Sequence, residues 1–235
     1  MLRLLHSADW HLDVKRRFND HVAALEWMIR KGIELQVDAF LFGGDFCGLD
    51  APHHARTREI LALFDLFRLA SGHAPTIVIP GNHDESEQFQ IFEKASLKNF
   101  WLFREPGAVI IPYDWNNDGT PVSVGFVALP WMGRAEIHER ANVPMEGIDN
   151  HGTQRLLTEL VQAQLAKVSR ATTKILLAHY PVPGGKMGEV EVQTSHDVTL
   201  DTPEIQDGFD YIALGHLHRR QSAKARTRDR RAWYS

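Results

Sequence analysis

The sequence predicts an α/β fold with a largely parallel sheet, from two kinds of observation in its first half. Short apolar runs at 2–7, 39–42 and 76–79 have the length of buried strands. Between them, 19–36 and 58–69 carry apolar residues at helical spacing. This alternation favours parallel strands joined by right-handed crossovers. Such sheets place their binding sites outside the carboxyl ends of the strands, so the residues that follow each strand are the first candidates for function.

The second half of the chain is expected to add four strands, at 108–112, 122–129, 174–178 and 211–214, and a helix at 154–168. Residues 134–152 lack clear periodicity and contain Pro144 and Gly147, so a long surface loop is predicted there. The sequence has no repeat and no linker-like segment, which favours one domain over residues 1–235. Because 232–235 looks like the start of a strand, we expect a fragment that lacks a C-terminal capping domain.

The composition indicates a globular protein of the ordinary soluble class. Hydrophobic residues make up 43% and charged residues 24% of the chain, and no apolar run approaches the ~20 residues of a membrane span. Cys47 is the only cysteine, which excludes an internal disulfide framework and suits a reducing compartment. We therefore expect a cytoplasmic protein that does not bind membranes.

The net charge of −4 conceals a basic segment near the end of the chain. Residues 219–235 contain seven basic residues and one acid, whereas residues 1–218 carry an acidic excess of 10. Arginines of this segment are candidates for contact with a phosphate backbone, namely Arg219, Arg220, Arg226, Arg228 and Arg230. A solvated hairpin whose charge only aids solubility is an equal alternative.

Residues of metal-binding type follow five of the predicted strands. The blocks are Asp9–His11, Gly44–Asp45, Gly81–Asp84, His179 and Gly215–His218. Each block alone is common in structural roles, but five in order at strand ends predict one shared site. Residues two apart in an extended chain point to the same side, so Asp9 and His11 are expected to converge, as are His216 and His218.

The mixture of donors in these blocks is typical of a site for two divalent metals. Carboxylate and amide oxygens occur together with imidazoles, and no thiolate is present, which argues against Ca²⁺ and against a structural zinc. We expect Mn²⁺, with Fe²⁺, Zn²⁺ and Mg²⁺ as alternatives. A pair of such metals indicates hydrolysis of a phosphate ester.

The blocks resemble the motifs D-x-H, G-D-x-x-D, G-N-H-[DE], H and G-H-x-H of the calcineurin-like metallophosphoesterase superfamily, over residues 5–218. Within it, His6–Leu12, Pro80–Asp84 and Leu214–His218 are most similar to SbcD-type DNA repair exonucleases, the nuclease subunit of SbcCD-type complexes. The resemblance implies a four-layer α/β/β/α sandwich with the metal site at the carboxyl ends of the strands. It also implies DNA as substrate and an SMC-like ATPase subunit as partner. A homodimer is a further candidate for the assembly.

The resemblance further implies a role for each residue of the blocks. One metal would be held by Asp9, His11 and His218, the other by Asn82, His179 and His216, and Asp45 would bridge them. His83 would be catalytic, by donating a proton to the leaving oxygen or stabilising its charge during attack by a metal-activated hydroxide.

One block departs from the family pattern at Gly48, where the motif has a second acid. Glycine has no side chain to orient His83. We expect another residue to supply that contact, with Asp50, His53, His54 and Asp84 as candidates.

Three functions remain to be distinguished. The leading hypothesis is a metal-dependent DNA exonuclease or endonuclease. The alternative is a small-molecule phosphodiesterase or phosphatase, for example one that acts on cyclic nucleotides. A non-catalytic scaffold is the third, and the complete set of predicted ligands argues against it. Trp10 and Trp131 would suit stacking on a base or sugar, or else packing in the core or at the lip of the site.

Overall fold

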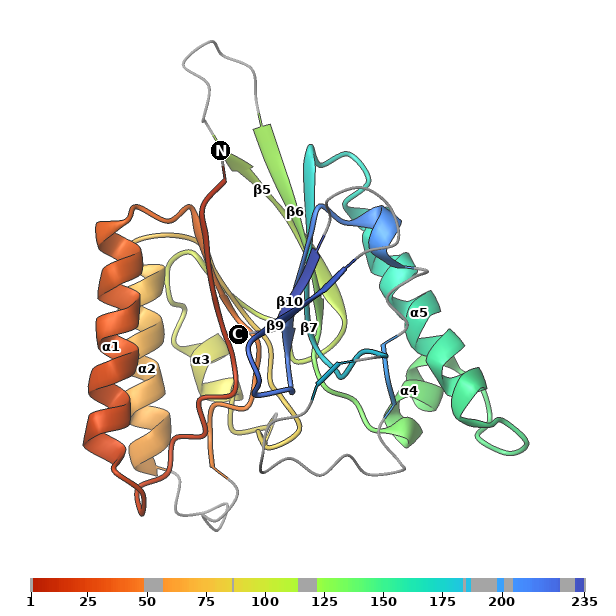
Figure 1. Cartoon of the computed structure of the whole chain (residues 1–235), viewed down its shortest axis with the longest axis horizontal. Coiled ribbons are helices and arrows are strands. Elements are labelled where there is room, and N and C mark those ends of the chain that lie inside the picture. The colour runs from red at the N-terminus through yellow and green to blue at the C-terminus, as the bar shows by residue number, and fades with distance from the viewer. Residues whose placement is uncertain are drawn as a thin grey trace.

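Two β-sheets lie face to face, and helices cover the outer side of each (Figure 1). This computed structural model describes residues 2–48, 57–85, 87–113, 122–183, 185–186, 198–200, 205–224 and 231–234. The arrangement confirms the predicted four-layer α/β/β/α sandwich.

The first sheet is entirely parallel, with its strands in chain order. Its elements are β1 (Leu4–Ser7), α1 (Phe18–Glu34), β2 (Ala39–Phe42), α2 (Thr57–Ser71), β3 (Thr76–Val78), α3 (Gln90–Lys94) and β4 (Phe100–Leu102). The strands and long helices predicted for the first half are confirmed to within a few residues. The short elements α3 and β4 were not predicted, because neither extends beyond five residues.

The second sheet is mixed and has the order β5-β6-β7-β8-β10-β9. Its elements are β5 (Gly107–Tyr113), β6 (Val122–Leu129), α4 (Arg134–Ala141), α5 (Asn150–Lys167), β7 (Thr173–His179), the short helix η2 (Gln206–Gly208), β8 (Tyr211–Gly215), β9 (Gln221–Lys224) and β10 (Arg231–Tyr234). Strands β6, β7, β8 and β10 run parallel to one another, and the edge strands β5 and β9 pair antiparallel with β6 and β10. The parallel strands of both sheets therefore end on the lower side of the molecule in Figure 1.

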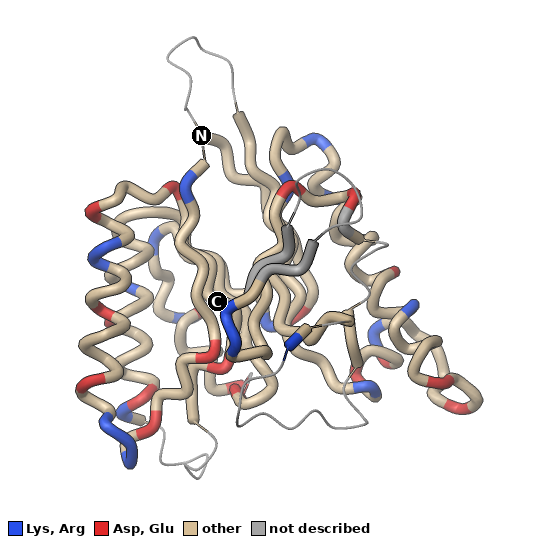
Figure 2. Tube along the Cα trace, in the orientation of Figure 1, with Lys and Arg blue, Asp and Glu red and all other residues tan. Residues whose placement is uncertain are grey.

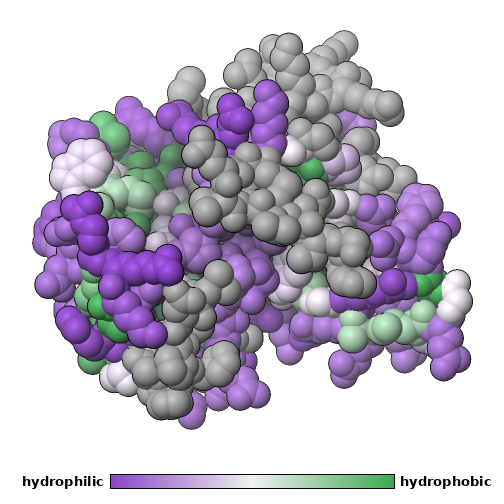
Figure 3. All heavy atoms as spheres, turned by 60° about the horizontal axis from the view of Figure 1, so that its bottom comes forward, coloured by the Kyte–Doolittle hydropathy of each residue, from purple (hydrophilic) through white to green (hydrophobic). Residues whose placement is uncertain are grey.

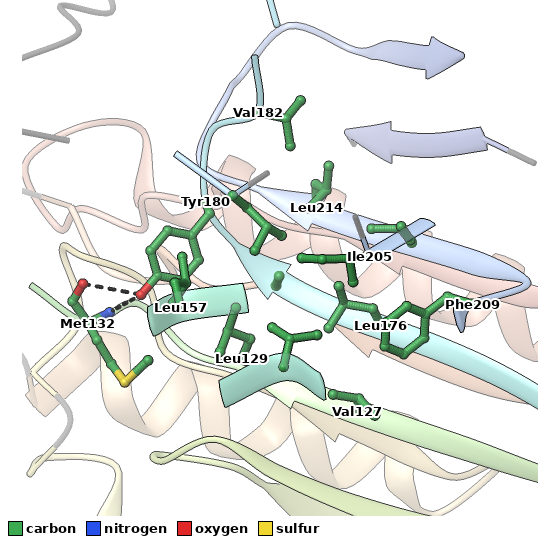
Figure 4. Close-up of a cluster of buried hydrophobic side chains, with 14 of the residues drawn as sticks. Val127, Leu129, Met132, Leu157, Leu176, Tyr180, Val182, Ile205, Phe209 and Leu214 are labelled. Atoms are coloured by element: carbon green, nitrogen blue, oxygen red, sulfur yellow. Dashed lines mark hydrogen bonds between the residues drawn. The ribbon is translucent and has the colours of Figure 1, made fainter. Parts of the chain in front are cut away.

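Three apolar layers hold the sandwich together. Between the sheets, Leu41 and Ile77 belong to the same buried cluster as Phe126 and Leu177. Outside the first sheet, an aromatic cluster that includes Phe67 packs under α2. Outside the second sheet, side chains of β6 and β7 pack against α5 (Figure 4). Full burial of one such side chain contributes about 1.5–3 kcal/mol, so these layers fix the positions of the strand ends.

The long surface loop predicted over 134–152 is wrong, because the structure has α4 there and an early start of α5. Helix α4 buries His138, whose ring nitrogens lie 3.2 Å from Val143 O and 3.0 Å from Thr153 Oγ1. A polar residue occupies an inward position, so the apolar spacing that normally reveals a helix is missing. Asp149 begins α5 by accepting a hydrogen bond from the Gly152 amide.

Charged residues of both signs alternate along α1 and α2, as expected of helices that face solvent (Figure 2). Hydrophilic residues dominate the described part of the face that carries the lower strand ends (Figure 3). Among the described residues, no helix is long and apolar enough to span a bilayer.

Candidate metal centre

The loops that follow β1 and β2 run side by side and are held together by backbone hydrogen bonds. The Asp9 amide donates to Gly44 O at 2.9 Å, and the His11 amide donates to Asp45 O at 2.9 Å. A parallel bridge between Leu12 and Cys47 continues this pairing beyond the strands. The first two predicted blocks are thereby fixed next to each other.

Four of the predicted ligands have left-handed backbone conformations. The φ angles are 55° at Asp9, 45° at His11, 55° at Asp45 and 90° at His216. Such conformations cost non-glycine residues about 1–3 kcal/mol each and persist only where surrounding contacts impose them. The prediction that Asp9 and His11 converge is confirmed, but the reason given for it, an extended chain, is wrong. They converge because the backbone turns at both residues.

Asp9, His11 and His218 form the first cluster of candidate ligands. One atom from each lies within 4.8 Å of the others. The Nε2 atoms of His11 and His218 are 3.0 Å apart, and Asp9 Oδ1 is 3.9 Å from His218 Nε2. The residues predicted to hold one metal are thus brought together.

Asn82, His179 and His216 form the second cluster. The Asn82 side-chain oxygen lies 3.1 Å from His179 Nε2 and 3.0 Å from His216 Nδ1. The carboxylate of Asp9 accepts a hydrogen bond from the His216 amide at 3.0 Å, which links this cluster to the first. His216 and His218 therefore belong to different clusters and would not bind the same metal ion.

Asp45 lies between the two clusters and is almost inaccessible. Its Oδ2 is 3.3 Å from His179 Nε2 and 3.9 Å from His11 Nε2, with 2% of the side chain exposed. Asp9, Asp45 and His179 also have ligand atoms within 4.8 Å of one another. Glycine is required at position 81, because a Cβ there would collide with the Asp45 carboxylate. The structure thus places Asp45 between the two sets of predicted ligands, and its role as a bridge between metals stays a prediction.

The charges of the centre depend strongly on one another. Burial alone would raise the pKa of Asp45, but the positive charge of His179 holds that pKa below its usual range. Burial alone would lower the pKa of His179, whereas the Asp45 carboxylate raises it to about 9. Burial lowers the pKa of His11 to about 4, helped by the charges of His218 and His83, so this imidazole is neutral at pH 7.

The donor set fits two divalent cations of the Mn²⁺, Fe²⁺ or Zn²⁺ type. Carboxylate, amide oxygen and imidazole groups point toward common space, and the His11 and His218 nitrogens face each other at a distance that a shared cation explains. That these residues bind metal stays a prediction, which titration with Mn²⁺ tests.

His83 lies beside the centre and belongs to neither cluster. Its amide donates to Asp45 Oδ1 at 2.9 Å, while its ring Nε2 is 3.8 Å from Asp45 Oδ2 and 3.0 Å from Asn82 Nδ2. About a quarter of the side chain, 26%, is exposed. This position suits a group that transfers a proton at the open side of the centre.

Asp84 holds the backbone of two blocks together. Its carboxylate accepts hydrogen bonds from the amides of Phe46, Cys47 and Gly81, at 3.0, 3.1 and 2.9 Å. Burial raises the pKa of Asp84 to about 6, assisted by the nearby charge of Asp45. Asp84 is therefore positioned to orient the loops under Asp45.

The space beside Gly48 is filled by Asp13, a buried acid that the sequence analysis did not single out. A Cβ at Gly48 would lie 3.0 Å from the Asp13 Cβ. The Asp13 carboxylate accepts from the Lys15 amide at 2.8 Å and lies 3.5 Å from Arg16 Nε. The other candidates for the missing contact, Asp50, His53 and His54, lie outside the described residues.

The basic segment begins directly at the centre. Arg219 and Arg220 follow His218, and both are exposed. Strands β9 and β10 pair antiparallel, which the hairpin alternative requires. Arg226, Arg228 and Arg230 lie between the two strands in the sequence, outside the described residues.

The two tryptophans of the sequence analysis have different environments. Trp10 is buried against Phe42 and Phe46 and donates to Ser7 Oγ, so it is a core residue. Trp131 stacks on the ring of His216. No local sequence signal reveals this contact, because it joins loops that follow different strands.

Known proteins share this architecture. The sequence matches the calcineurin-like phosphoesterase family over residues 2–220. Solved structures with the same fold include GAP50, the anchor in the inner membrane complex of Plasmodium (13% identity, TM-score 0.60), with coverage of 99% of this chain and 70% of that one. The protein TT1561 of Thermus thermophilus is 15% identical with a TM-score of 0.56, and coverage is 100% and 89%. A dimetal phosphatase from Danio rerio is 11% identical with a TM-score of 0.53, and coverage is 99% and 86%.

These structural similarities establish the fold, and the family match covers nearly the whole chain. The family is one of phosphoester hydrolases with a dinuclear metal centre, and the described residues supply candidate ligands for such a centre. The chain belongs to the calcineurin-like phosphoesterase family.

Proposed function

We propose that this protein is a DNA nuclease that hydrolyses phosphodiester bonds with two Mn²⁺ ions. The observation that carries the proposal is the position of Arg219 and Arg220, which are exposed and directly follow His218 at the open edge of the centre. Two arginines beside the reacting position suit a continuous polyanion, because they would contact phosphates that flank the one under attack.

The reaction requires a metal pair, a fixed scissile phosphate and a proton for the leaving oxygen. When bound, the metals activate water and neutralise charge on the phosphate. Asp45 lies between the clusters, where its carboxylate would be shared by the two metals. His83 lies on the partly exposed side and donates the proton to the oxygen that leaves phosphorus.

The finer assignment rests on the resemblance of the blocks to SbcD-type exonucleases. It brings with it an SMC-like ATPase subunit and a homodimer as proposed partners. It also brings DNA end processing as the proposed role. The alternative substrate, a cyclic nucleotide or another small phosphodiester, uses the same centre and differs in its need for the arginines.

Degradation of plasmid DNA and of labelled oligonucleotides with added Mn²⁺ tests the proposal. The wild-type protein should degrade DNA, and Asp45→Asn and His216→Ala should abolish the activity. Reversal of charge in Arg219→Glu/Arg220→Glu should weaken DNA binding most at low salt, because fewer counterions are released. Arg30→Glu is the matched control, since Arg30 is an exposed arginine of α1 that pairs with Glu26.

A different set of results would favour the alternative function, hydrolysis of a small phosphodiester. A wild-type protein that leaves all DNA substrates intact but hydrolyses a cyclic mononucleotide or dinucleotide would overturn the nuclease assignment. If the double charge-reversal variant and Arg30→Glu bind DNA equally well, Arg219 and Arg220 do not contribute to DNA binding.

A further inference from the structure

We propose that Trp131 is a positioning residue, which holds the imidazole of His216 in the orientation that the metal centre needs. The proposal rests on the two-metal centre and not on the identity of the substrate. It assigns a task to a residue outside the five metal-binding blocks.

The two rings are stacked with nearly parallel planes. The ring centroids of Trp131 and His216 are 5.2 Å apart, and their planes differ by 10°. Trp131 also stacks on Tyr180, at 5.1 Å and 28°. Tyr180 directly follows the candidate ligand His179, so the indole contacts one candidate ligand, His216, and the neighbour of another.

The segment that carries Trp131 is itself held firmly. The Trp131 amide donates to Pro80 O at 3.2 Å, next to the block that contains Asn82. The buried Tyr180 hydroxyl accepts from the Met132 amide at 2.8 Å and donates to Met132 O at 3.1 Å (Figure 4). These bonds attach the loop after β6 to two strand ends of the centre.

His216 needs such support because its backbone alone does not fix its ring. The His216 amide is anchored on Asp9, and the residue has a φ of 90°. Rotation of an imidazole about its outer side-chain torsion has a broad energy profile, so an anchored backbone leaves the ring orientation weakly defined. A flat indole lying parallel to the ring restrains the plane of the imidazole. Within that plane, the contact of Nδ1 with Asn82 Oδ1 at 3.0 Å selects which edge of the ring faces the centre.

The first test is titration of the metal-free protein with Mn²⁺ alone. Trp131→Leu removes the aromatic face, and we expect affinity for one of the two Mn²⁺ ions to fall about tenfold, a typical loss when a group that orients a ligand is removed. Trp131→Phe retains a smaller face and should lose less. Trp27→Phe is the control, because Trp27 is 68% exposed on α1.

A spectroscopic readout shows whether Mn²⁺ binds next to the Trp131 indole. Mn²⁺ at the centre should quench the fluorescence of Trp131, so part of the wild-type quenching should disappear in Trp131→Phe and remain in Trp27→Phe. Thermal denaturation of the metal-free variants measures any loss of folding independently.

With saturating Mn²⁺, the kcat of Trp131→Phe should return toward the wild-type value without a change in KM for a generic phosphodiester. Unchanged Mn²⁺ affinity with a raised KM would overturn the proposal and make Trp131 a substrate contact. If Trp131→Leu does not fold, the test uses Trp131→Phe alone. Wild-type Mn²⁺ affinity in that variant, together with unchanged quenching by Mn²⁺, would also overturn the proposal. Failure of the nuclease assignment leaves these Mn²⁺ measurements unaffected.

Discussion

The Nε2 atoms of His11 and His218 lie 3.0 Å apart although 207 positions separate the two residues in the chain. Each histidine is carried by a different sheet, so the pair forms only when the two sheets pack together. Because the pKa of His11 is lowered to about 4, chiefly by burial, its nitrogen is available to a cation at neutral pH. Metal binding at this pair is therefore coupled to folding of the whole sandwich.

Binding of metal at neutral pH should release a proton from His179. The Asp45 carboxylate raises the pKa of His179 to about 9 against the effect of burial, so the metal-free protein carries an imidazolium there at pH 7.5. Only the neutral imidazole binds a metal. Calorimetric titration in two buffers with different ionisation enthalpies should show release of about one proton at pH 7.5 and progressively less above pH 9. An enthalpy that is the same in both buffers at pH 7.5 contradicts this expectation.

Substitution of His83 by alanine should abolish turnover while metal stays bound. The contact of His83 with Asp45 is made by the backbone amide, and the side chain belongs to neither ligand cluster. We expect kcat to fall by about 10²–10⁴-fold, the usual contribution of a general acid. Mass spectrometry of the metal-loaded variant should still find about two metal ions per chain. Loss of metal would make His83 a ligand.

Replacement of Asp84 by asparagine should destabilise the metal-free protein. The amides of Phe46, Cys47 and Gly81 donate to its carboxylate, and an amide group offers only one oxygen in place of two. Leaving a buried donor unpaired costs about 1–3 kcal/mol, so urea denaturation should show a loss of that size. Asp65→Asn, at an exposed ion pair of α2, should change stability by less than about 0.5 kcal/mol. Equal effects of the two substitutions would contradict the structural role of Asp84.

His6 should make the protein less stable in mild acid. Burial lowers the pKa of His6 to about 4 from 6.5, so the unfolded chain binds a proton between these pH values and the folded protein does not. The stability from the neutral histidine is complete above pH 6.5 and is lost as the pH falls toward 4, by about 1–3 kcal/mol. Urea denaturation between pH 7 and 4 should show a weaker pH dependence in His6→Gln. His151→Gln, at an exposed site on α5, should retain the wild-type dependence.

Much of the architecture could be predicted from the sequence because its signals are local. The strand at 39–42 and the helix beginning near residue 57 follow from apolar runs and spacing. Helix α4 was missed because only Ile137 and His138 are buried in it, and one of these is polar. Asp149, the N-cap residue of α5, is of a type that commonly precedes a helix, so the sequence does contain a signal for the start of α5.

The grouping of candidate ligands at strand ends could also be predicted, but their backbone geometry could not. Asp9 and His11 have left-handed conformations, which are uncommon outside glycine, and hydrogen bonds to the neighbouring loop of β2 hold them there. The contacts of Trp131 and Asp13 likewise involve residues that are distant in the sequence. Both depend on loops that meet only in the folded protein.

The two-metal centre is tested most directly by the metal content of the protein after reconstitution with Mn²⁺ and removal of excess ion. We predict about two Mn²⁺ per chain in the wild type and fewer than one in Asp45→Asn, because Asp45 lies between the two clusters. Asp20→Asn, at an exposed ion pair at the start of α1, should keep the wild-type content. A wild-type protein that binds one Mn²⁺ or none, or an Asp45→Asn variant that loads as fully as the wild type, would contradict the two-metal centre.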